Sequence, residues 1–383
     1  MRRRLWWSLM SFDSRIGELS NSKSLSLDPT WDCRIPLNVN DSDLRPEMKE
    51  APVAQEHCTD AVFAVVRGEL GDCIRYSNWH LDFSNPVLKS IARHVQDAVN
   101  QQVGDLDALE RKVEDQYLNL CDPEVPLHFI TTWMTRAQIA KCRLLEYYSN
   151  ISTSSNTPGH RISPQIETTI PYAFRMLECD TKIMRSPLTK GYIWMAEMHF
   201  PFPGYVHIVQ ELKRNPLSKH AEKAWETMGE NFDARFSAIT THHTPLFKIF
   251  ATAVLPAWEA REAVARDSGE EIAPPSVVTS IKYILDQMSQ DPQDRHTAAA
   301  TSQPTNDLMN LDYTDLSMTM PMSFDSNSML FDMGFDMGMS GQNGYASNGV
   351  GVYPSPYGQV PLDVDMNKVN WTMMNTGFHG QSG

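Results

Sequence analysis

Apolar side chains recur every three or four residues through most of the first 290 positions, which is the spacing of one face of an α-helix. Strict two-residue alternation, the signature of a half-buried strand, is rare in the same region. The opening helical stripe, over residues 2–19, consists of Leu5, Trp6, Leu9, Phe12, Ile16 and Leu19. The spacing therefore predicts an all-α fold of many helices.

Prolines and polar loops separate the predicted helices. We expect helices at about 2–19, 59–76, 86–117, 127–148, 171–185, 190–200, 205–213, 220–236, 246–266 and 276–290. The stretch 86–117 alternates steps of three and four and contains Gly104, so it is either a coiled coil or, as we favour, helices paired within the chain. Residues 150–164 are rich in Ser, Thr, Asn, Pro and Gly, which predicts a loop.

The chain changes character after residue 290. Residues 296–383 hold eight Asp, no Glu, one basic residue (Lys368) and eleven of the 21 methionines. This composition lacks the apolar surface needed to offset chain entropy, which predicts a disordered tail. We therefore divide the chain into a helical domain, 1–290, and a disordered Asp/Met-rich tail, 291–383.

Aspartates in this tail alternate with large apolar groups. Repulsion between carboxylates keeps such a segment extended and leaves its apolar side chains in water, available to a shallow groove on a coactivator. The composition also fits an inert low-complexity tail. The residues that we expect to contact coactivators are Leu311, Tyr313, Leu316, Phe324, Phe331 and Phe335.

Motifs for catalysis or metal binding are missing from the sequence. No two of the six cysteines lie closer than 15 positions, so no local pair places two thiolates on one turn for zinc. Phosphate-binding loops, dinucleotide fingerprints and nucleophile elbows do not occur. We expect no catalytic, cofactor-binding or metal-binding residue in this chain, and free thiols in a reducing compartment.

Charge and hydropathy argue against two kinds of partner, nucleic acids and membranes. The net charge of −14 does not suit binding along a nucleic-acid backbone. No apolar run approaches the roughly 18 residues of a membrane span, so we expect a soluble intracellular protein without a membrane partner.

Two motifs resemble a known family. The first is the RRRLWW opening with an aspartate one or two turns later, and the second is WDCRIPLNVNDSDL at 31–44. Together they resemble the fungal-specific transcription factor domain, which is the middle homology region of zinc-cluster (binuclear, six-cysteine) regulators; the resemblance covers roughly residues 2–260. The motif residues are Arg3, Arg4, Trp6, Trp7, Asp13, Pro36, Asn38, Asn40 and Asp41.

The resemblance implies a nuclear transcription regulator of a pathway-specific gene set, such as a secondary-metabolite cluster. In that family the DNA contact belongs to an upstream zinc cluster, which this sequence does not contain. We therefore expect zinc only if an upstream cluster exists, and DNA binding only through that cluster or a partner's. Coactivators are the expected partners of the tail, and homo- or heterodimers are compatible with the family.

Two alternatives remain open at this point. The chain is a scaffold or dominant-negative partner that does not bind DNA and pairs with full-length regulators, or it is an α-helical enzyme with an unrecognised site. Converging buried polar groups with perturbed pKa values beside a pocket would favour the enzyme.

Overall fold

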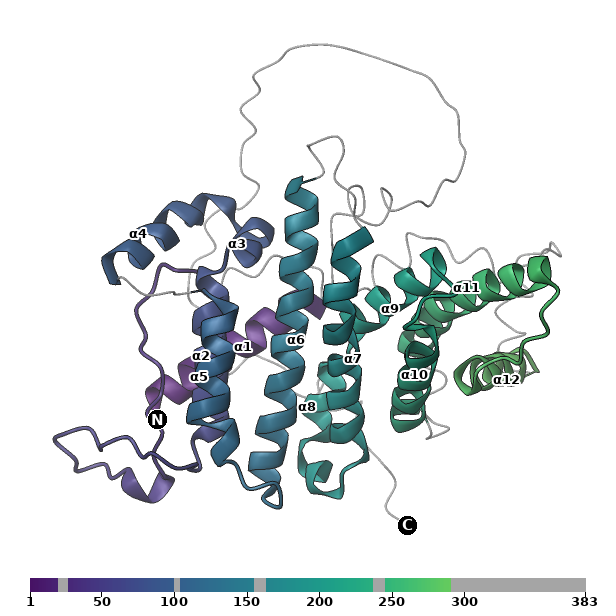
Figure 1. Cartoon of the computed structure of the whole chain (residues 1–383). Helices are drawn as coiled ribbons and strands as arrows, with labels where there is room; N and C mark the ends of the chain where they lie inside the picture. The colour runs from purple at the N-terminus through teal and green to yellow at the C-terminus, as the bar shows by residue number, and fades with distance from the viewer. Residues whose placement is uncertain (20–26, 100–103, 155–162, 237–244, 291–383) are drawn as a thin grey trace, which may run out of the picture. The chain divides into compact units, whose positions relative to one another are not determined.

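The computed structural model describes residues 1–19, 27–99, 104–154, 163–236 and 245–290. Over these ranges the regular elements are helices and no strand occurs, which confirms the all-α prediction (Figure 1). The α-helices are α1 (Arg2–Leu19), α2 (Val62–Tyr76), α3 (Asn78–Ser84), α4 (Lys89–Val99), α5 (Leu106–Gln116), α6 (Pro126–Ser154), α7 (Ser163–Arg185), α8 (Ile193–Met198), α9 (Phe202–Arg214), α10 (Ala221–Phe236), α11 (Pro245–Ser268) and α12 (Ser276–Gln290). The 3₁₀ turns are η1 (Asp41–Asp43), η2 (Pro86–Leu88), η3 (Leu118–Leu120) and η4 (Pro187–Tyr192). None of these described helices combines the length and apolar character that crossing a bilayer requires.

Helix α6 connects the hydrophobic cores. It places Leu144 in the largest core, Ile139 and Cys142 in a second core, and Ile130 in a third. A helix that buries side chains in several directions needs apolar residues around most of its circumference, and α6 accordingly has no single apolar stripe. It packs against α7 on one side and α2 on the other.

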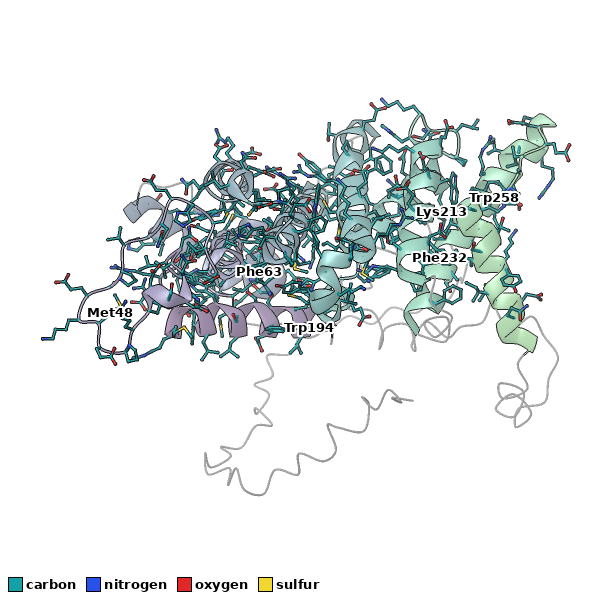
Figure 2. All side chains as sticks on the ribbon, turned by 90° about the horizontal axis from the view of Figure 1, so that it is seen from below. Met48, Phe63, Trp194, Lys213, Phe232 and Trp258 are labelled. Atoms are coloured by element: carbon teal, nitrogen blue, oxygen red, sulfur yellow. The ribbon has the colours of Figure 1, made fainter. Side chains whose placement is uncertain are left out.

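The largest core lies among α6, α7, α9, α10, α11 and α12. Aromatic side chains dominate it: the rings of Phe232 and Phe250 stack with centroids 5.5 Å apart, and Tyr205 meets Phe250 edge-on at 4.7 Å. Trp225 and Trp258 meet edge-on at 5.9 Å. Figure 2 shows Phe232 and Trp258 on neighbouring helices of this part. Such pairs stabilise a core beyond the area that they bury.

The predicted helical stretch 86–117 is broken into two helices with separate cores. Gly104, at φ +88°, lies between them, and a Cβ there would approach the carbonyl oxygen of Tyr76 to 3.0 Å. Helix α4 buries Ala92 with Leu81, whereas α5 buries its stripe against α2 and α6. The two helices thus pack within the chain, as favoured over a coiled coil, but they bury their apolar residues in different cores.

Two predicted boundaries around the 150–164 loop are wrong. Helix α6 continues to Ser154, and α7 begins at Ser163 with Pro171 inside it. An interior proline costs a helix about 3 kcal/mol. The turn before Pro171 is held by burial of Ile170 and by a hydrogen bond between Thr169 and His207, which a local pattern does not reveal. Residues 155–162 of the predicted loop lie outside the described residues.

The short helix α3 was not predicted. It has seven residues and buries only Leu81 and Ser84, so no periodic stripe marks it. Residues 190–200, predicted as one helix, form η4 followed by the short α8. The tail 291–383, with its predicted disorder, lies outside the described residues.

Candidate functional site

The tryptophans of the opening motif form a joint between α1 and α2. Trp7 is 1% exposed, its ring meets Trp31 edge-on at 5.1 Å, and its Nε1 donates to the carbonyl oxygen of Arg34 at 3.2 Å. The Arg75 guanidinium lies 4.0 Å over the Trp31 ring and donates to the Trp31 carbonyl at 2.7 Å. A Cβ on Gly71 would lie 2.9 Å from the Trp7 ring. Glycine at that position therefore lets α1 approach α2 closely.

The arginines of α1 bind the segment that follows it. Arg4 forms an ion pair with Asp41 and donates to the carbonyl oxygen of Val39 at 2.8 Å. Arg3 donates to the carbonyl oxygen of Ile35 at 3.5 Å. Cations at a helix N-terminus oppose the helix dipole. These arginines are held instead by a carboxylate and carbonyls outside the helix.

The asparagines of the second motif tie two parts of the loop before α2 together. Asn38 is buried; its Nδ2 donates to the carbonyl oxygen of His57 at 2.7 Å, and its Oδ1 accepts from the Thr59 hydroxyl at 2.7 Å. Asn40 Oδ1 accepts from the Asp60 amide at 3.2 Å. The Asn38 amide donates and accepts at once, which an ionised aspartate of the same shape could not do because a carboxylate only accepts.

The other motif residues lie at the edges of this joint. Trp6 is 36% exposed and meets Trp31 edge-on at 5.3 Å. Pro36 lies beside α2, 3.2 Å from where a Cβ on Gly68 would stand. Asp13 lies on the exposed side of α1. The motif residues brought together here make packing contacts between elements.

The apolar stripe of α1 lies on its exposed side. Leu5, Leu9 and Ile16 are each more than half exposed, while Phe12 stacks on Trp194 of α8 with centroids 6.1 Å apart. Periodicity finds a stripe but does not say which side of the helix faces the body. Contiguous exposed apolar side chains are typical of surfaces that contact other macromolecules.

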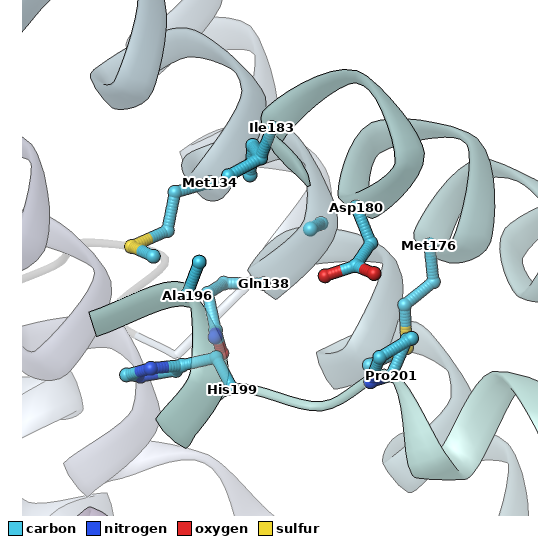
Figure 3. A pocket seen from close by; sticks show the side chains of 9 residues that line it. Met134, Gln138, Met176, Asp180, Ile183, Ala196, His199 and Pro201 are labelled. Carbon is cyan, nitrogen blue, oxygen red and sulfur yellow. The ribbon is translucent and has the colours of Figure 1, made fainter. Parts of the chain in front are cut away.

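A buried ion pair joins α7 and α10, two helices of the largest core. Arg235 Nε lies 2.6 Å from Asp180 Oδ2, and Asn231 Nδ2 donates to the same oxygen at 2.8 Å. The Tyr205 hydroxyl donates to Asn231 Oδ1 at 2.7 Å. A cavity of about 20 Å³ adjoins Asp180 and His199 (Figure 3), which is room for about one water. This cavity is too small for a substrate.

Buried histidines are held by hydrogen bonds. His207 lies between the Tyr148 hydroxyl, 2.9 Å from Nδ1, and the Thr169 hydroxyl, 3.0 Å from Nε2. Burial, with a smaller effect of Arg214, lowers the pKa of His207 to about 4. Both ring nitrogens thus have partners and the ring stays neutral at physiological pH. The perturbed pKa that would favour an enzyme here results from burial in a packed core, not from a pocket.

Cys58, Cys121 and His128 meet where the sequence predicted no site. Cys58 precedes α2, Cys121 follows η3, and His128 lies in the first turn of α6. The two sulfurs are 3.3 Å apart, and the ligand atoms of all three residues lie within 4.8 Å of one another. Burial raises the pKa of Cys58 to about 12, so its thiol is protonated at neutral pH. The sequence carries no signal for this cluster, because 63 positions separate the cysteines.

Comparison with known proteins points to one class, the fungal transcription regulators. Curated relatives of the chain are named as transcriptional regulators or transcription factors of fungi, which supports a fungal transcription factor family and does not support an enzyme. No protein-family model matches the chain. No solved structure gives a significant match.

Three relatives illustrate the similarity. The transcriptional regulator AacuB of Aspergillus aculeatus is 44% identical over 334 residues, which cover 87% of this chain and 45% of that protein. The transcriptional regulator nsrM of Aspergillus novofumigatus is 35% identical over 389 residues, covering 98% and 50%. The aurofusarin cluster transcription factor aurR2 of Gibberella zeae is 26% identical over 280 residues, covering 70% and 39%. The chain spans about half the length, or less, of these curated relatives.

The predicted coactivator-contacting residues of the tail all lie outside the described residues. Within the described residues, the predicted opening motif lies in the joint between α1 and α2 and along the exposed stripe of α1. The sequence did not predict the cysteine–histidine cluster, whose residues meet only in the folded chain.

Proposed function

We propose that this chain is the regulatory part of a fungal transcription regulator of the zinc-cluster type, and that residues 1–290 are its middle homology region. The observation that carries the proposal is the 44% identity to AacuB over 87% of the chain. The paired buried polar groups of the body support action by contact and not by catalysis. DNA binding in this proposal comes from a six-cysteine zinc cluster, on the same polypeptide or on a partner.

The names of relatives suggest the kind of genes controlled. One relative is an aurofusarin cluster transcription factor, and another, from Pyricularia oryzae, is a pyriculol/pyriculariol biosynthesis cluster transcription factor that is 25% identical over 279 residues. We infer that this chain acts in the nucleus on a pathway-specific set of genes for a secondary metabolite.

The tail is the part that we propose to recruit the transcription machinery. Its aspartates repel one another and keep large apolar side chains accessible, so that they can bind a shallow apolar groove of a coactivator. Its methionines add flexible surface that can pack against more than one partner.

A tethering experiment tests this proposal. The full chain is fused to a heterologous DNA-binding domain, and reporter transcription is measured at matched protein levels. We expect activation by the unchanged chain and loss of most of it when Tyr313, Phe331 and Phe335 are replaced by alanine. Replacement of Gln342, Asn343 and Asn348 by alanine is the matched control and should change little. A tethered chain that activates nothing, or activation indifferent to the aromatic residues, contradicts the proposal.

A further inference from the structure

We propose that Cys58, Cys121 and His128 form a binding site for a divalent metal ion of the Zn²⁺ class. In a tetrahedral site with Zn–S bonds of about 2.3 Å, two thiolate sulfurs lie about 3.8 Å apart. The sulfurs of Cys58 and Cys121 are already 3.3 Å apart, and no two ligand atoms of the three residues are farther apart than 4.8 Å. Small side-chain rotations therefore bring all three ligands to bonding distance of one ion.

The types of ligand atom determine which metal ion the site prefers. Two thiolates and an imidazole suit Zn²⁺, and three protein ligands leave the fourth tetrahedral position to water. The three residues are each half-buried, so solvent and ion can reach them. Two thiolates also balance the charge of the dication, which matters because an uncompensated charge in a half-buried place is costly.

The binding step requires no oxidant. Each thiol loses its proton as its sulfur bonds to the ion, so two S–H bonds break, two metal–sulfur bonds form and two protons pass to solvent. A disulfide between the same sulfurs would need a two-electron oxidant and would not involve His128. The third ligand at the same point is what favours the metal ion.

A bound ion would link three segments of the chain that are separate in sequence. Cys58 belongs to the loop before α2, Cys121 to the connection between α5 and α6, and His128 to α6 itself. The proposed ion is separate from the zinc cluster of the proposed function, and either proposal can fail without the other.

Binding has a consequence at a neighbouring amide. The backbone N–H of Asp122 donates to Nδ1 of His128 at 3.1 Å. A neutral imidazole has a single nitrogen lone pair, so the ring cannot ligate a metal and accept this hydrogen bond at once. Whichever nitrogen binds the ion, the Asp122 amide is released and should exchange its proton faster.

Cobalt is the probe for the test, because a thiolate-bound tetrahedral Co²⁺ ion absorbs characteristically. The full-length chain is reduced, freed of metal with a chelator and titrated with Co²⁺. We expect thiolate-to-cobalt charge-transfer bands that saturate at one ion per chain, release of two protons per ion, and displacement by Zn²⁺. Hydrogen exchange at Asp122 should accelerate on binding.

Single substitutions assign the ligands. Cys58→Ser and Cys121→Ser should each lower Co²⁺ affinity by about 100-fold or more and weaken the charge-transfer bands, and His128→Ala should lower affinity while keeping both thiolate contributions. Cys33→Ser is the matched control, since Cys33 is also half-buried but lies outside the cluster. Absence of thiolate bands in the unchanged chain, bands indifferent to Cys58→Ser and Cys121→Ser, or a Cys58–Cys121 disulfide in a chain that binds no metal when reduced would each overturn the proposal.

Discussion

Trp6 and Trp7 are adjacent in α1 but lie in different environments. Trp7 is buried between α2 and Trp31, and its indole N–H has a carbonyl partner. Trp6 lies at the edge of the same joint and is 36% exposed. Because adjacent helical positions are about 100° apart, the two side chains point in different directions, and only that of Trp7 points into the joint.

Alanine at these two positions should therefore have unequal effects. We expect Trp7→Ala to lower the free energy of unfolding by about 3–5 kcal/mol, as for a large buried aromatic. Trp6→Ala should lower it by about 1 kcal/mol. Urea unfolding followed by circular dichroism gives both values, and equal losses would contradict the joint described for α1.

The Asp180–Arg235 pair gives a second contrast between residues. Removing one partner of a buried ion pair leaves an uncompensated charge, so Asp180→Ala should cost about 3–5 kcal/mol. Glu178 is the control: it pairs with Lys223 at 3.0 Å, but both side chains are largely exposed, and Glu178→Ala should cost less than about 1 kcal/mol. Thermal and urea unfolding measure the free energy that each variant loses. Equal losses would show that solvent reaches Asp180.

Helix α1 approaches α2 closely at Gly71. In an unobstructed helix, alanine is favoured over glycine by about 1 kcal/mol. At Gly71 the added Cβ would lie 2.9 Å from the Trp7 ring, which is held by a hydrogen bond, by the Trp31 ring and by the Arg75 guanidinium.

Gly71→Ala should accordingly destabilise the chain, by about 1–3 kcal/mol, despite the better helix propensity. Gly191→Ala is the matched control, because nothing lies within 4 Å of its added Cβ. The melting temperature and the tryptophan fluorescence report the effect. A higher melting temperature for Gly71→Ala would show that α1 does not pack there.

Helix positions were largely predictable where strong local signals mark both ends. The bounds Arg2–Leu19 and Ser276–Gln290 agree with the sequence prediction, and α10 differs from it by one residue. Local patterns failed where tertiary contacts decide. Burial of Ile170 and the Thr169–His207 hydrogen bond hold the turn before Pro171, although a proline normally marks a helix start.

The site was predictable only in part, for the same reason. The motif residues of α1 and of the loop after it meet as expected of neighbours in sequence. The exposed side of α1 and the meeting of Cys58 with Cys121 depend on how distant helices pack, and periodicity or spacing carries no information about either.

For the chain as a whole, buried neutral histidines determine how the free energy of unfolding changes as the pH falls. Burial, followed by the nearby Arg15 cation, lowers the pKa of His199 to about 3, and burial lowers that of His207 to about 4. Unfolded histidines titrate near pH 6.5, so between that value and these lowered pKa values the unfolded chain binds more protons than the folded one. Stability is complete above about pH 6.5 and falls as the pH drops.

We therefore expect the free energy of unfolding to fall by about 2–3 kcal/mol between pH 7.5 and pH 5.5. Below about pH 4.5 the loss should continue, because protonation of Glu18 replaces the declining contribution of the histidines. Burial alone would raise the pKa of Glu18, but Lys141 and Arg15 together lower it to about 2, so its stabilising ion pairs are lost only in that range. Urea titrations at successive pH values test this. His207→Gln should reduce the slope above pH 4.5, and a flat profile from pH 7.5 to 5.5 would contradict the burial of these histidines.

The body of the chain joins its helices through packed aromatic rings and paired polar groups, which suits a protein that works through contacts with other macromolecules. The central claim that it regulates transcription is tested most directly by measuring transcript levels after deletion of its gene in the organism that encodes it. We expect transcripts of a limited set of biosynthetic genes to fall and to return when the gene is restored. An unchanged transcript profile under conditions in which the protein is made would contradict it.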